Sequence, residues 1–451
     1  MTGNCLIVKL IFKKALRRGS MIIGIREEDK SIFERRVAIT PDVVKELVSQ
    51  GFKVIVEPSS HRIFPDSEFE KAGAELKKDL SEAKVIFGVK EIPKEKLMPE
   101  KTYVFFSHTI KGQSYNMPML KKILELKDTL IDYEKITDDK GRRLIFFGKF
   151  AGFAGAIDAL YLLGQKLKSE GESNIFESVK RAYDYPSLKD AKEEISKLKN
   201  KIENGELPKS LKPFIIGFAG YGNVSKGAQE ILDLLGPKEI TPEELLNGKY
   251  EKEGIYKVVF KEEHMVEPKE DGYEFELYDY YNNPEKYRGV FSRYLPYLNL
   301  LVNAIYWEER YPRIVTKDDM KKLWKEGNKK LKIIADISCD IEGAVEFTFE
   351  CGEPDKPSLV YEPLKDSYHL GVEGDGPAVL MVDILPSELP KEASEYFSHV
   401  LREFIPDIVK ADYSVSFEKL NLPAPIKRAV IAHRGELTPD YKYIENYLKN
   451  S

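Results

Sequence analysis

Short apolar runs alternate with helix-forming stretches along the chain from Met21 onward, and this alternation restricts the fold more than any other feature. The runs MIIGI, KVIVE, VIFGV, YVFFS and TLIDY have strand length, and the helical segments TPDVVKELVSQG, FEKAGAEL and MPMLKKILELKD lie between them. In the first helical segment Thr40 suits the N-cap, Pro41 the first helical position and Gly51 the end of the helix. Strands that alternate with helices predict βαβ units, a mostly parallel sheet and therefore an α/β fold.

The alternation occurs twice, which predicts two domains. A first, substrate-binding unit covers residues 21–150, and the helical stretch FAGFAGAIDALYLLGQKLKS leads into a second unit at about 151–384, with strands in PFIIGFAG, LLVNAIYW and KIIADIS. Residues from about 385 to 451 are expected to form one long helix over PSELPKEASEYFSHVLREFIPDIVKAD and a last helix over DYKYIENYLKN, which return to the first domain. The sequence thus predicts two Rossmann-like domains with parallel sheets around a central cleft, the first of them discontinuous.

Composition restricts the classes of function. The formal net charge of −5 gives no electrostatic reason to expect nucleic acid or an anionic membrane as partner, and no apolar run approaches the roughly 18 residues that span a bilayer. Cys5, Cys339 and Cys351 have neither a disulfide framework nor a metal-ligand spacing, so we expect no metal site and a cytoplasmic location. Residues 1–20 are basic but lack the order of a secretory signal, so we expect an extension outside the fold.

The stretch FAGYGNVSKGAQ places glycines between a predicted strand and a predicted helix. A dinucleotide fold needs a tight turn at the first glycine and bare backbone at the second, so that pyrophosphate can approach the helix N-terminus. Ser225 stands where a third glycine is usual, and Gly227 follows two residues later. With a strand before it and a helix after it, the turn favours a nucleotide site over a plain loop. The residues expected to contact the cofactor are Gly220, Tyr221, Gly222, Asn223 and Val224.

The choice between NAD and NADP depends on the end of the second strand of this unit. We expect that strand to end between Glu239 and Thr241, where no clear ribose-binding acid stands. Lys238 and Lys261 are candidate partners for a 2′-phosphate, and exposed lysines without a ligand are an equally good interpretation of both.

Polar side chains follow two strands of the first domain. Lys90 and Glu91 come directly after VIFGV, and His108 comes directly after YVFFS. If these strands are parallel, the three residues lie at one sheet edge, where ligands bind in such folds. A lysine of lowered pKa and a histidine near neutrality could transfer protons in reductive amination. A salt-bridged surface lysine and a loop histidine are the alternative.

Arginines are also frequent in the first domain. Arg26 and Arg36 lie in IREEDKSIFERRVAITP, and Arg142 and Arg143 lie in GRRLIFFGKFAGFAG. A guanidinium group can hold a carboxylate through two hydrogen bonds, which suits dicarboxylate substrates. Surface ion pairs are the alternative for each of them.

Several of these segments together resemble a known family. GIREEDKSIFERRVAITP, GVKEIP, FFSHTIKGQ, FGKFAGFAGAIDAL, GYGNVSKGAQEI, NAIYWEERYPRIVT, IADISCDIEGAVEF and DILPSELPKEASEYF resemble, in this order, the lysine–ketoglutarate reductase domain of aminoadipic semialdehyde synthase. More loosely, they are similar to the lysine-forming saccharopine dehydrogenases and to the alanine dehydrogenase/transhydrogenase superfamily.

The resemblance implies an oxidoreductase that condenses L-lysine with 2-oxoglutarate and reduces the product to saccharopine, or catalyses the reverse reaction. It implies that Lys90 and His108 are the acid–base pair. It implies NADP as cofactor, with NAD as the alternative, and it is compatible with a homo-oligomer. The family's substrate-binding arginines and carboxylates match Arg26, Arg36, Arg143, Glu91 and Glu134, and Asp336 in IADIS matches an aspartate beside the cofactor and substrate.

Two other classes of function stay open at this point. One is a related amino-acid or opine dehydrogenase that acts on a different amine. The other is a non-catalytic nucleotide-binding regulator, which the presence of both proton-transfer residues disfavours.

Overall fold

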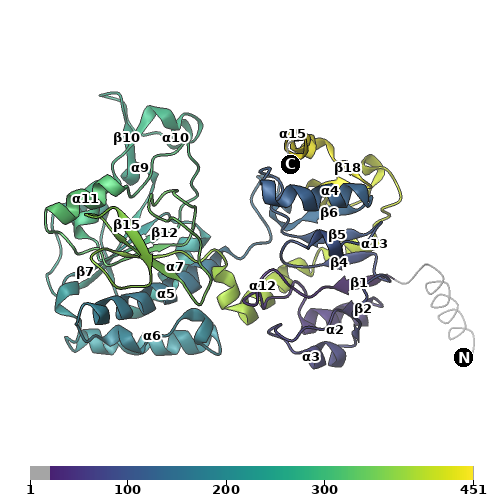
Figure 1. Cartoon of the computed structure of the whole chain (residues 1–451), viewed down its shortest axis with the longest axis horizontal. Helices are drawn as coiled ribbons and strands as arrows, with labels where there is room; N and C mark the ends of the chain where they lie inside the picture. Colours follow the sequence, from purple (N-terminus) through teal and green to yellow (C-terminus); the bar gives the residue numbers. More distant parts are fainter. Residues whose placement is uncertain (1–20, 450–451) are drawn as a thin grey trace, which may run out of the picture. The chain divides into compact units, whose positions relative to one another are not determined.

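A computed structural model describes residues 21–449 (Figure 1), so the expected N-terminal extension lies outside the described residues. The chain folds into two compact units, and each unit has its own sheet. The described part of the first unit comprises residues 21–146 and 390–449, and the second unit is Phe147–Leu389. The expected α/β class, with two sheets and a discontinuous first unit, is confirmed.

The first unit contains an eight-stranded sheet in the order β18-β17-β6-β5-β4-β1-β2-β3. All pairs from β6 to β3 are parallel, whereas β17 pairs antiparallel with β6 and β18 antiparallel with β17. The strands are β1 (Ile22–Ile25), β2 (Lys53–Val56), β3 (Glu75–Leu76), β4 (Val85–Phe87), β5 (Thr102–Phe105), β6 (Thr129–Asp132), β17 (Val430–His433) and β18 (Glu436–Leu437). The helices are α2 (Pro41–Ser49), α3 (Asp66–Lys71), α4 (Met117–Glu125), α12 (Pro390–Leu401), α13 (Ile405–Lys410), α14 (Ala424–Arg428) and α15 (Glu445–Leu448).

Helix boundaries in this unit follow the capping signals, with two exceptions. Thr40 is the N-cap of α2 and Pro41 its first residue, as predicted. The segment FEKAGAEL is not one helix, because α3 ends at Lys71 and Gly73 has a φ of +96°, after which Glu75 and Leu76 form β3. The long helix expected over residues 386–412 is also wrong. Pro390 begins α12 and Pro406 lies in the first turn of α13, where a ring without an N–H group interrupts helical hydrogen bonding.

Helix α12 belongs to the core of the first unit although it lies more than 350 residues from the segment it contacts. The hydroxyl groups of Ser394 and Ser398 accept hydrogen bonds from the backbone N–H groups of Val37 and Thr40. The ring of Phe397 packs edge-on against Tyr133, with ring centres 4.9 Å apart. These contacts and the β6–β17 pairing explain why the first unit includes the C-terminal part of the chain.

The second unit also has eight strands in one sheet, in the order β15-β14-β16-β13-β12-β7-β9-β8. The five pairs from β16 to β8 are parallel, while β14 runs antiparallel to β15 and β16. The strands are β7 (Phe214–Ala219), β8 (Lys238–Glu239), β9 (Ile255–Phe260), β12 (Leu300–Asn303), β13 (Ile333–Asp336), β14 (Ser358–Glu362), β15 (Ser367–Leu370) and β16 (Ala378–Leu380).

Seven α-helices and a small two-stranded sheet complete the described part of this unit. The helices are α5 (Gly148–Ser169), α6 (Leu188–Glu203), α7 (Asn223–Leu232), α8 (Pro242–Leu246), α9 (Glu262–Met265), α10 (Leu277–Asn282) and α11 (Lys317–Lys325), and the small sheet pairs β10 (Val266–Pro268) with β11 (Tyr287–Gly289). In Figure 1, α9, β10 and α10 lie together at one end of the unit, and α9 follows β9 in the chain.

Candidate active site

The carboxyl ends of four neighbouring parallel strands bring the predicted polar residues of the first unit to one sheet edge. Strands β1, β4, β5 and β6 are adjacent and parallel. Arg26 follows β1, Lys90 and Glu91 lie three and four residues beyond β4, His108 lies three residues beyond β5, and Glu134 lies two residues beyond β6. The parallel arrangement on which the prediction depended is therefore present.

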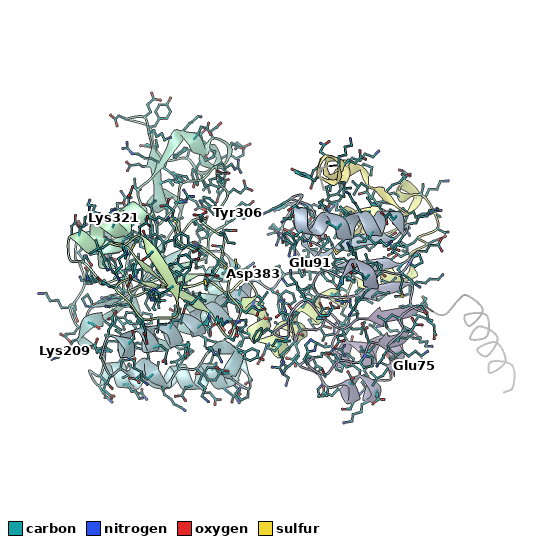
Figure 2. The ribbon with its side chains drawn as sticks, in the orientation of Figure 1. Glu75, Glu91, Lys209, Tyr306, Lys321 and Asp383 are labelled. Atoms are coloured by element: carbon teal, nitrogen blue, oxygen red, sulfur yellow. The ribbon has the colours of Figure 1, made fainter. Side chains whose placement is uncertain are left out.

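Glu91 connects three of these segments. Its Oε1 lies 2.6 Å from Nδ1 of His108, and Lys30 Nζ donates to both carboxylate oxygens at 3.0 and 2.9 Å. Asn116 Nδ2 lies 3.4 Å from the same Oε1 and 3.3 Å from the backbone oxygen of His108. Glu91, labelled in Figure 2, is 9% exposed, whereas the side chain of His108 is 31% exposed. The imidazole of His108 is thus accessible to a ligand, while the carboxylate of Glu91 that binds it is buried.

The charge state of this cluster is set by two opposing effects. Burial raises the pKa of Glu91. The hydrogen bond and the charge of His108, together with Lys30, have the larger opposite effect, so the pKa lies well below its usual range. Glu91 is therefore a carboxylate at neutral pH. An ionised carboxylate at Nδ1 favours the tautomer that carries its proton there, which leaves Nε2 of His108 to exchange a proton with a ligand.

A second buried carboxylate shapes the turn that carries Lys90. Glu28 Oε1 accepts a hydrogen bond from the N–H of Val89 at 2.7 Å, and Oε2 accepts one from the N–H of Lys90 at 2.9 Å. Burial raises the pKa of Glu28, and the charge of Arg26 opposes this effect. Because both N–H groups are bound, the backbone at Lys90 is held in one position while its side chain stays partly exposed.

The predicted arginines are all paired with carboxylates, in different surroundings. Arg36 and Glu34 are both buried and share two hydrogen bonds, from Nε at 2.7 Å and from Nη2 at 2.5 Å. Arg26 is also buried, and its Nη2 donates to Asp29 at 2.6 Å.

Arg143 is 51% exposed and pairs with Glu134, so of Arg26, Arg36 and Arg143 it has the most accessible side chain, while its neighbour Arg142 is 74% exposed and pairs with Asp138. The interpretation as surface ion pairs therefore fails for Arg26 and Arg36, because these pairs lie inside the unit.

The glycine turn of the second unit has the shape that a dinucleotide requires. Gly220 has a φ of +96°, and a Cβ there would lie 2.9 Å from the backbone oxygen of Ala304, so only glycine fits. Gly222 is the N-cap of α7, and a Cβ there would meet nothing within 4 Å. No side chain caps the N-terminus of α7, and the backbone N–H groups of its first turn are where a pyrophosphate group would bind.

Ser225 takes the place of the third glycine of the usual pattern, and α7 packs closely against α5 at Gly227. Ser225 is fully buried and accepts a hydrogen bond from Gln229 Nε2 at 3.0 Å. A Cβ on Gly227 would lie 2.2 Å from the backbone oxygen of Lys149, and a Cβ on Gly152 would lie 2.0 Å from the backbone oxygen of Val224. Helices α5 and α7 therefore touch through backbone, and Gly227 serves the packing between two helices.

Asp336 ends β13, which β12 separates from the strand before the turn, and both of its oxygens bind protein groups. Oδ1 accepts hydrogen bonds from Asn303 Nδ2 at 2.8 Å and Ser338 Oγ at 3.1 Å, and Oδ2 accepts one from Thr348 Oγ1 at 2.6 Å. Burial raises the pKa of Asp336, and these three donors oppose the effect. In this structure Asp336 holds together the loops that follow β12 and β13.

The second strand of this unit in chain order does end at Glu239, as expected, but it does not lie beside β7. The strand beside β7 is β9, which ends at Phe260, whereas β8 with Lys238 and Glu239 lies outside it at the sheet edge. Sequence order misled the prediction because residues 240–254, including α8, intervene between an edge strand and its inner neighbour. Lys261 directly follows β9, so of the two lysines considered it is the one beside the turn.

Several residues of the site were not predicted. Lys30 and Asn116 at Glu91, Glu28 at Lys90, Glu34 at Arg36 and Asn303 at Asp336 were all missed. The three that lie in IREEDKSIFERR follow β1 directly, so their position after a strand was an available signal. The sequence offered no comparable signal for Asn116.

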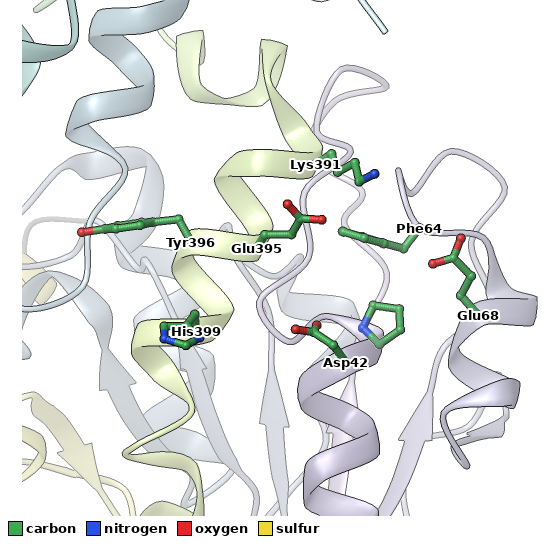
Figure 3. A pocket seen from close by; sticks show the side chains of 8 residues that line it. Asp42, Phe64, Glu68, Lys391, Glu395, Tyr396 and His399 are labelled. Atoms are coloured by element: carbon green, nitrogen blue, oxygen red, sulfur yellow. The ribbon is translucent and has the colours of Figure 1, made fainter. Parts of the chain in front are cut away.

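A separate hollow of the first unit, of about 680 Å³, lies between α2 and α12 (Figure 3). Its lining is Pro41, Asp42, Phe64, Glu68, Lys391, Glu395, Tyr396 and His399. None of the predicted site residues lines it, so we assign the chemistry to the strand ends.

The described residues, 21–449, lack both a metal-binding cluster and a membrane-spanning helix. Among them, no group of three or more histidine, cysteine, aspartate and glutamate side chains is arranged to hold a metal ion. Over the same residues, no helix has both the length and the apolar character needed to cross a bilayer.

Comparisons with known proteins agree with the fold and with the resemblance seen in the sequence. The family model "Alanine dehydrogenase/PNT, N-terminal domain" matches residues 24–154. The chain is 38% identical to the mitochondrial alpha-aminoadipic semialdehyde synthase of Bos taurus over 448 residues, which are 95% of this chain and 48% of that protein. It is 28% identical to the NAD(+), L-lysine-forming saccharopine dehydrogenase of Emericella nidulans, over 85% of this chain and 91% of that protein.

Solved structures show the same architecture. An L-alanine dehydrogenase has a TM-score of 0.62 at 15% identity and covers 95% of this chain and 99% of its own, and a transhydrogenase from Sinorhizobium meliloti has a TM-score of 0.57 at 17% identity, with 92% and 100% covered. At such identities these structures show the fold alone. The chain spans about half the length of the synthases it matches.

Proposed function

On the premise that this chain is a relative of the alpha-aminoadipic semialdehyde synthases and the lysine-forming saccharopine dehydrogenases, we propose that it interconverts saccharopine with L-lysine and 2-oxoglutarate. In the forward direction the ε-amine of lysine condenses with the ketone of 2-oxoglutarate, water leaves, and the carbon–nitrogen double bond gains a hydride and a proton. A nicotinamide dinucleotide supplies or accepts the hydride when it is bound at the glycine turn.

The observation that carries this proposal is the hydrogen-bonded pair of Glu91 and His108, in which Glu91 directly follows Lys90 in the sequence. Condensation and loss of water both need a proton to be moved at nitrogen and at oxygen, and we assign this task to Nε2 of His108 and the amine of Lys90. Glu91 stays ionised beside Nδ1 and thus holds the imidazole in the useful tautomer. Lys30 balances the charge of Glu91 when His108 is neutral.

The substrates carry carboxylates that need cationic partners. We assign Arg143 to one of them, because it is more exposed than Arg26 and Arg36 and its present partner Glu134 lies just beyond the end of β6, among the other strand-end residues. Arg26 and Arg36 keep the neighbouring acidic groups in place and could bind a substrate carboxylate only by giving up a buried ion pair.

The cofactor, location and assembly belong to the same proposal. The resemblance favours NADP over NAD, and this preference stays a prediction. The residues around the glycine turn are the ones that would decide between the two dinucleotides. A cytoplasmic location is supported by the use of cysteine, since Cys339 and Cys351 are both free thiols. We propose no nucleic-acid or membrane partner, and a homo-oligomer remains compatible with the chain.

A substrate panel tests the reaction. Oxidation of NADH and of NADPH is followed at 340 nm with lysine plus 2-oxoglutarate, and in parallel with alanine, glycine or ammonia paired with 2-oxoglutarate, pyruvate or glyoxylate. We expect turnover only with lysine and 2-oxoglutarate, and saccharopine as the product by mass spectrometry. Turnover with another amine would identify a different amino-acid or opine dehydrogenase, and dinucleotide binding without any turnover would identify a regulator.

A further inference from the structure

Strand β9 brings an unassigned carboxylate to the glycine turn. The backbone N–H of Gly220 donates to the backbone oxygen of Phe260 at 3.0 Å, so the last residue of β9 lies beside the first glycine of the turn. Glu262 is the second residue after that strand. In dinucleotide-binding folds the end of the strand next to the glycine turn faces the adenosine ribose, and an acid there accepts hydrogen bonds from the 2′-hydroxyl group of NAD.

The carboxylate of Glu262 is held in place by one tyrosine and lies near a second. Tyr281 Oη donates to its Oε1 at 2.6 Å. Tyr221, the middle residue of the glycine turn, is close enough to feel the charge of the same carboxylate. Burial and, secondly, this carboxylate raise the pKa of both phenols, so both remain donors at neutral pH. An acceptor that is already oriented loses little conformational freedom when a ribose hydroxyl binds to it.

The cationic groups nearby are placed less favourably for a 2′-phosphate. The side chain of Lys261 is exposed, so its ammonium group is a mobile point charge in water. Nη2 of Arg293 lies 3.3 Å from the backbone oxygen of His264, and its guanidinium group lies over the ring of Tyr294, 5.0 Å from its centre. A phosphate group placed at the ribose would therefore meet the fixed charge of Glu262 before either cation.

We propose that Glu262, held by Tyr281 beside the glycine turn, is the residue that selects the cofactor and that it makes NADH the preferred dinucleotide of this chain. This inference rests on the proposed function for the presence of a nicotinamide cofactor and deepens it. It also reverses the preference for NADP that the resemblance implies, because the resemblance contains no information on the side chains after β9.

Binding measurements test the proposal without the reaction. The full chain is titrated with NADH and with NADPH, without lysine or 2-oxoglutarate, and dissociation constants are obtained from the cofactor fluorescence. We expect NADH to bind at least about tenfold more tightly than NADPH, the effect of one or two hydrogen bonds to a charged group. Glu262→Gln and Glu262→Ser should weaken NADH and strengthen NADPH, so that the ratio falls at least about tenfold.

A matched control removes a neighbouring charge. Glu263 is exposed and faces His264 at 3.7 Å, so Glu263→Gln removes one negative charge without touching the proposed ribose site. Its ratio of dissociation constants should stay within about twofold of wild type. Circular dichroism and the thermal midpoint of each variant confirm that it is folded.

The outcomes separate the two proposals. Tighter binding of NADPH by the wild type, lost in Lys261→Ala and unaffected in Glu262→Gln, overturns the assignment of Glu262 and leaves the reaction untouched. A preference for NADH that disappears in both Glu262 variants supports it, even if no turnover with lysine is found. If neither dinucleotide binds, both proposals are wrong.

Discussion

Glu91 and His108 face each other across the ends of neighbouring parallel strands, with Oε1 of the carboxylate 2.6 Å from Nδ1 of the imidazole. The two residues are 17 positions apart in the sequence, and the backbone at His108 has a φ of +48°. A histidine in this sparsely populated conformation costs free energy, which the surrounding contacts must offset. The pairing is therefore a defined feature of the fold and the basis of the first two predictions.

Replacement of Glu91 should change the response of stability to pH. Because its folded-state pKa is depressed, Glu91 contributes stability that is fully present above its unfolded value of about 4.3 and is lost as pH falls toward its folded value. Lys30, His108 and Asn116 are the groups that face it. We expect Glu91→Gln to unfold at a lower temperature than wild type at pH 6 to 8, and the difference to shrink at pH 3. A difference independent of pH would mean that the carboxylate is not ionised in the folded chain.

Replacement of the proton-transfer residues should affect turnover and spare cofactor binding. Lys90→Met and His108→Gln should each lower kcat by about 10²- to 10⁴-fold, the usual contribution of a general acid or base, with unchanged dissociation constants for the dinucleotide. Steady-state kinetics with lysine and 2-oxoglutarate check this. Lys94→Met and His399→Gln, which change exposed residues of the same unit, are the controls. A variant within a few-fold of wild type is not a proton-transfer residue.

Gly222→Val should abolish dinucleotide binding while the chain still folds. The Cβ position faces open space, so the protein accommodates the side chain, but that side chain occupies the volume that a pyrophosphate group needs. Fluorescence titration measures binding, and circular dichroism measures folding. Unchanged affinity would show that the turn is a loop without a ligand.

Gly227→Ala, only five residues further on, should instead lower the stability of the fold. Its Cβ would lie 2.2 Å from the backbone oxygen of Lys149, so α5 and α7 must move apart. We expect a loss of about 1–3 kcal/mol in the free energy of unfolding, as for other overpacked sites. Chemical denaturation measures this loss, and a variant as stable as wild type would contradict the close contact of the two helices.

The arginines should separate into two classes. Arg143→Ala should raise the KM for 2-oxoglutarate or for lysine about 10- to 100-fold and leave the KM for the dinucleotide unchanged, because a charge-assisted pair contributes about 1.5–3 kcal/mol. Lysine at this position should restore only part of the loss, since it lacks the planar fork. Arg142→Ala, which removes an exposed ion pair with Asp138, is the matched control.

Arg36→Ala should act mainly on stability. It leaves Glu34 buried without its partner, for which a cost of about 3–5 kcal/mol is typical. Thermal unfolding measures this effect. An Arg36→Ala variant that is fully stable but has a raised substrate KM would return Arg36 to the role expected from the sequence, as a substrate ligand.

Much of the architecture could be predicted because its signals are local. The apolar runs that became β1, β2, β4, β5 and β6, the cap at Thr40 and the turn at Gly220 each depend on a few consecutive residues. The prediction of one helix over residues 386–412 was wrong for a local reason as well. It followed the periodic apolar pattern, whereas the two prolines, Pro390 and Pro406, each stand in the first turn of a separate helix. Strand β18 was missed because it has only two residues, and β17 was missed because its partner β6 lies some 300 residues away in the sequence.

The sequence by itself determined which residues follow the strands, and therefore that Lys90, Glu91 and His108 share one edge of a parallel sheet. Only the tertiary structure decided the partners: that Lys30 binds Glu91, that Arg36 binds Glu34, and that β9 rather than β8 lies beside β7. The physical reason is the range of the forces. Hydrophobic periodicity and capping act over a few residues and leave a trace in the sequence, whereas strand order and the choice of an ion-pair partner are settled when distant segments pack and exclude water.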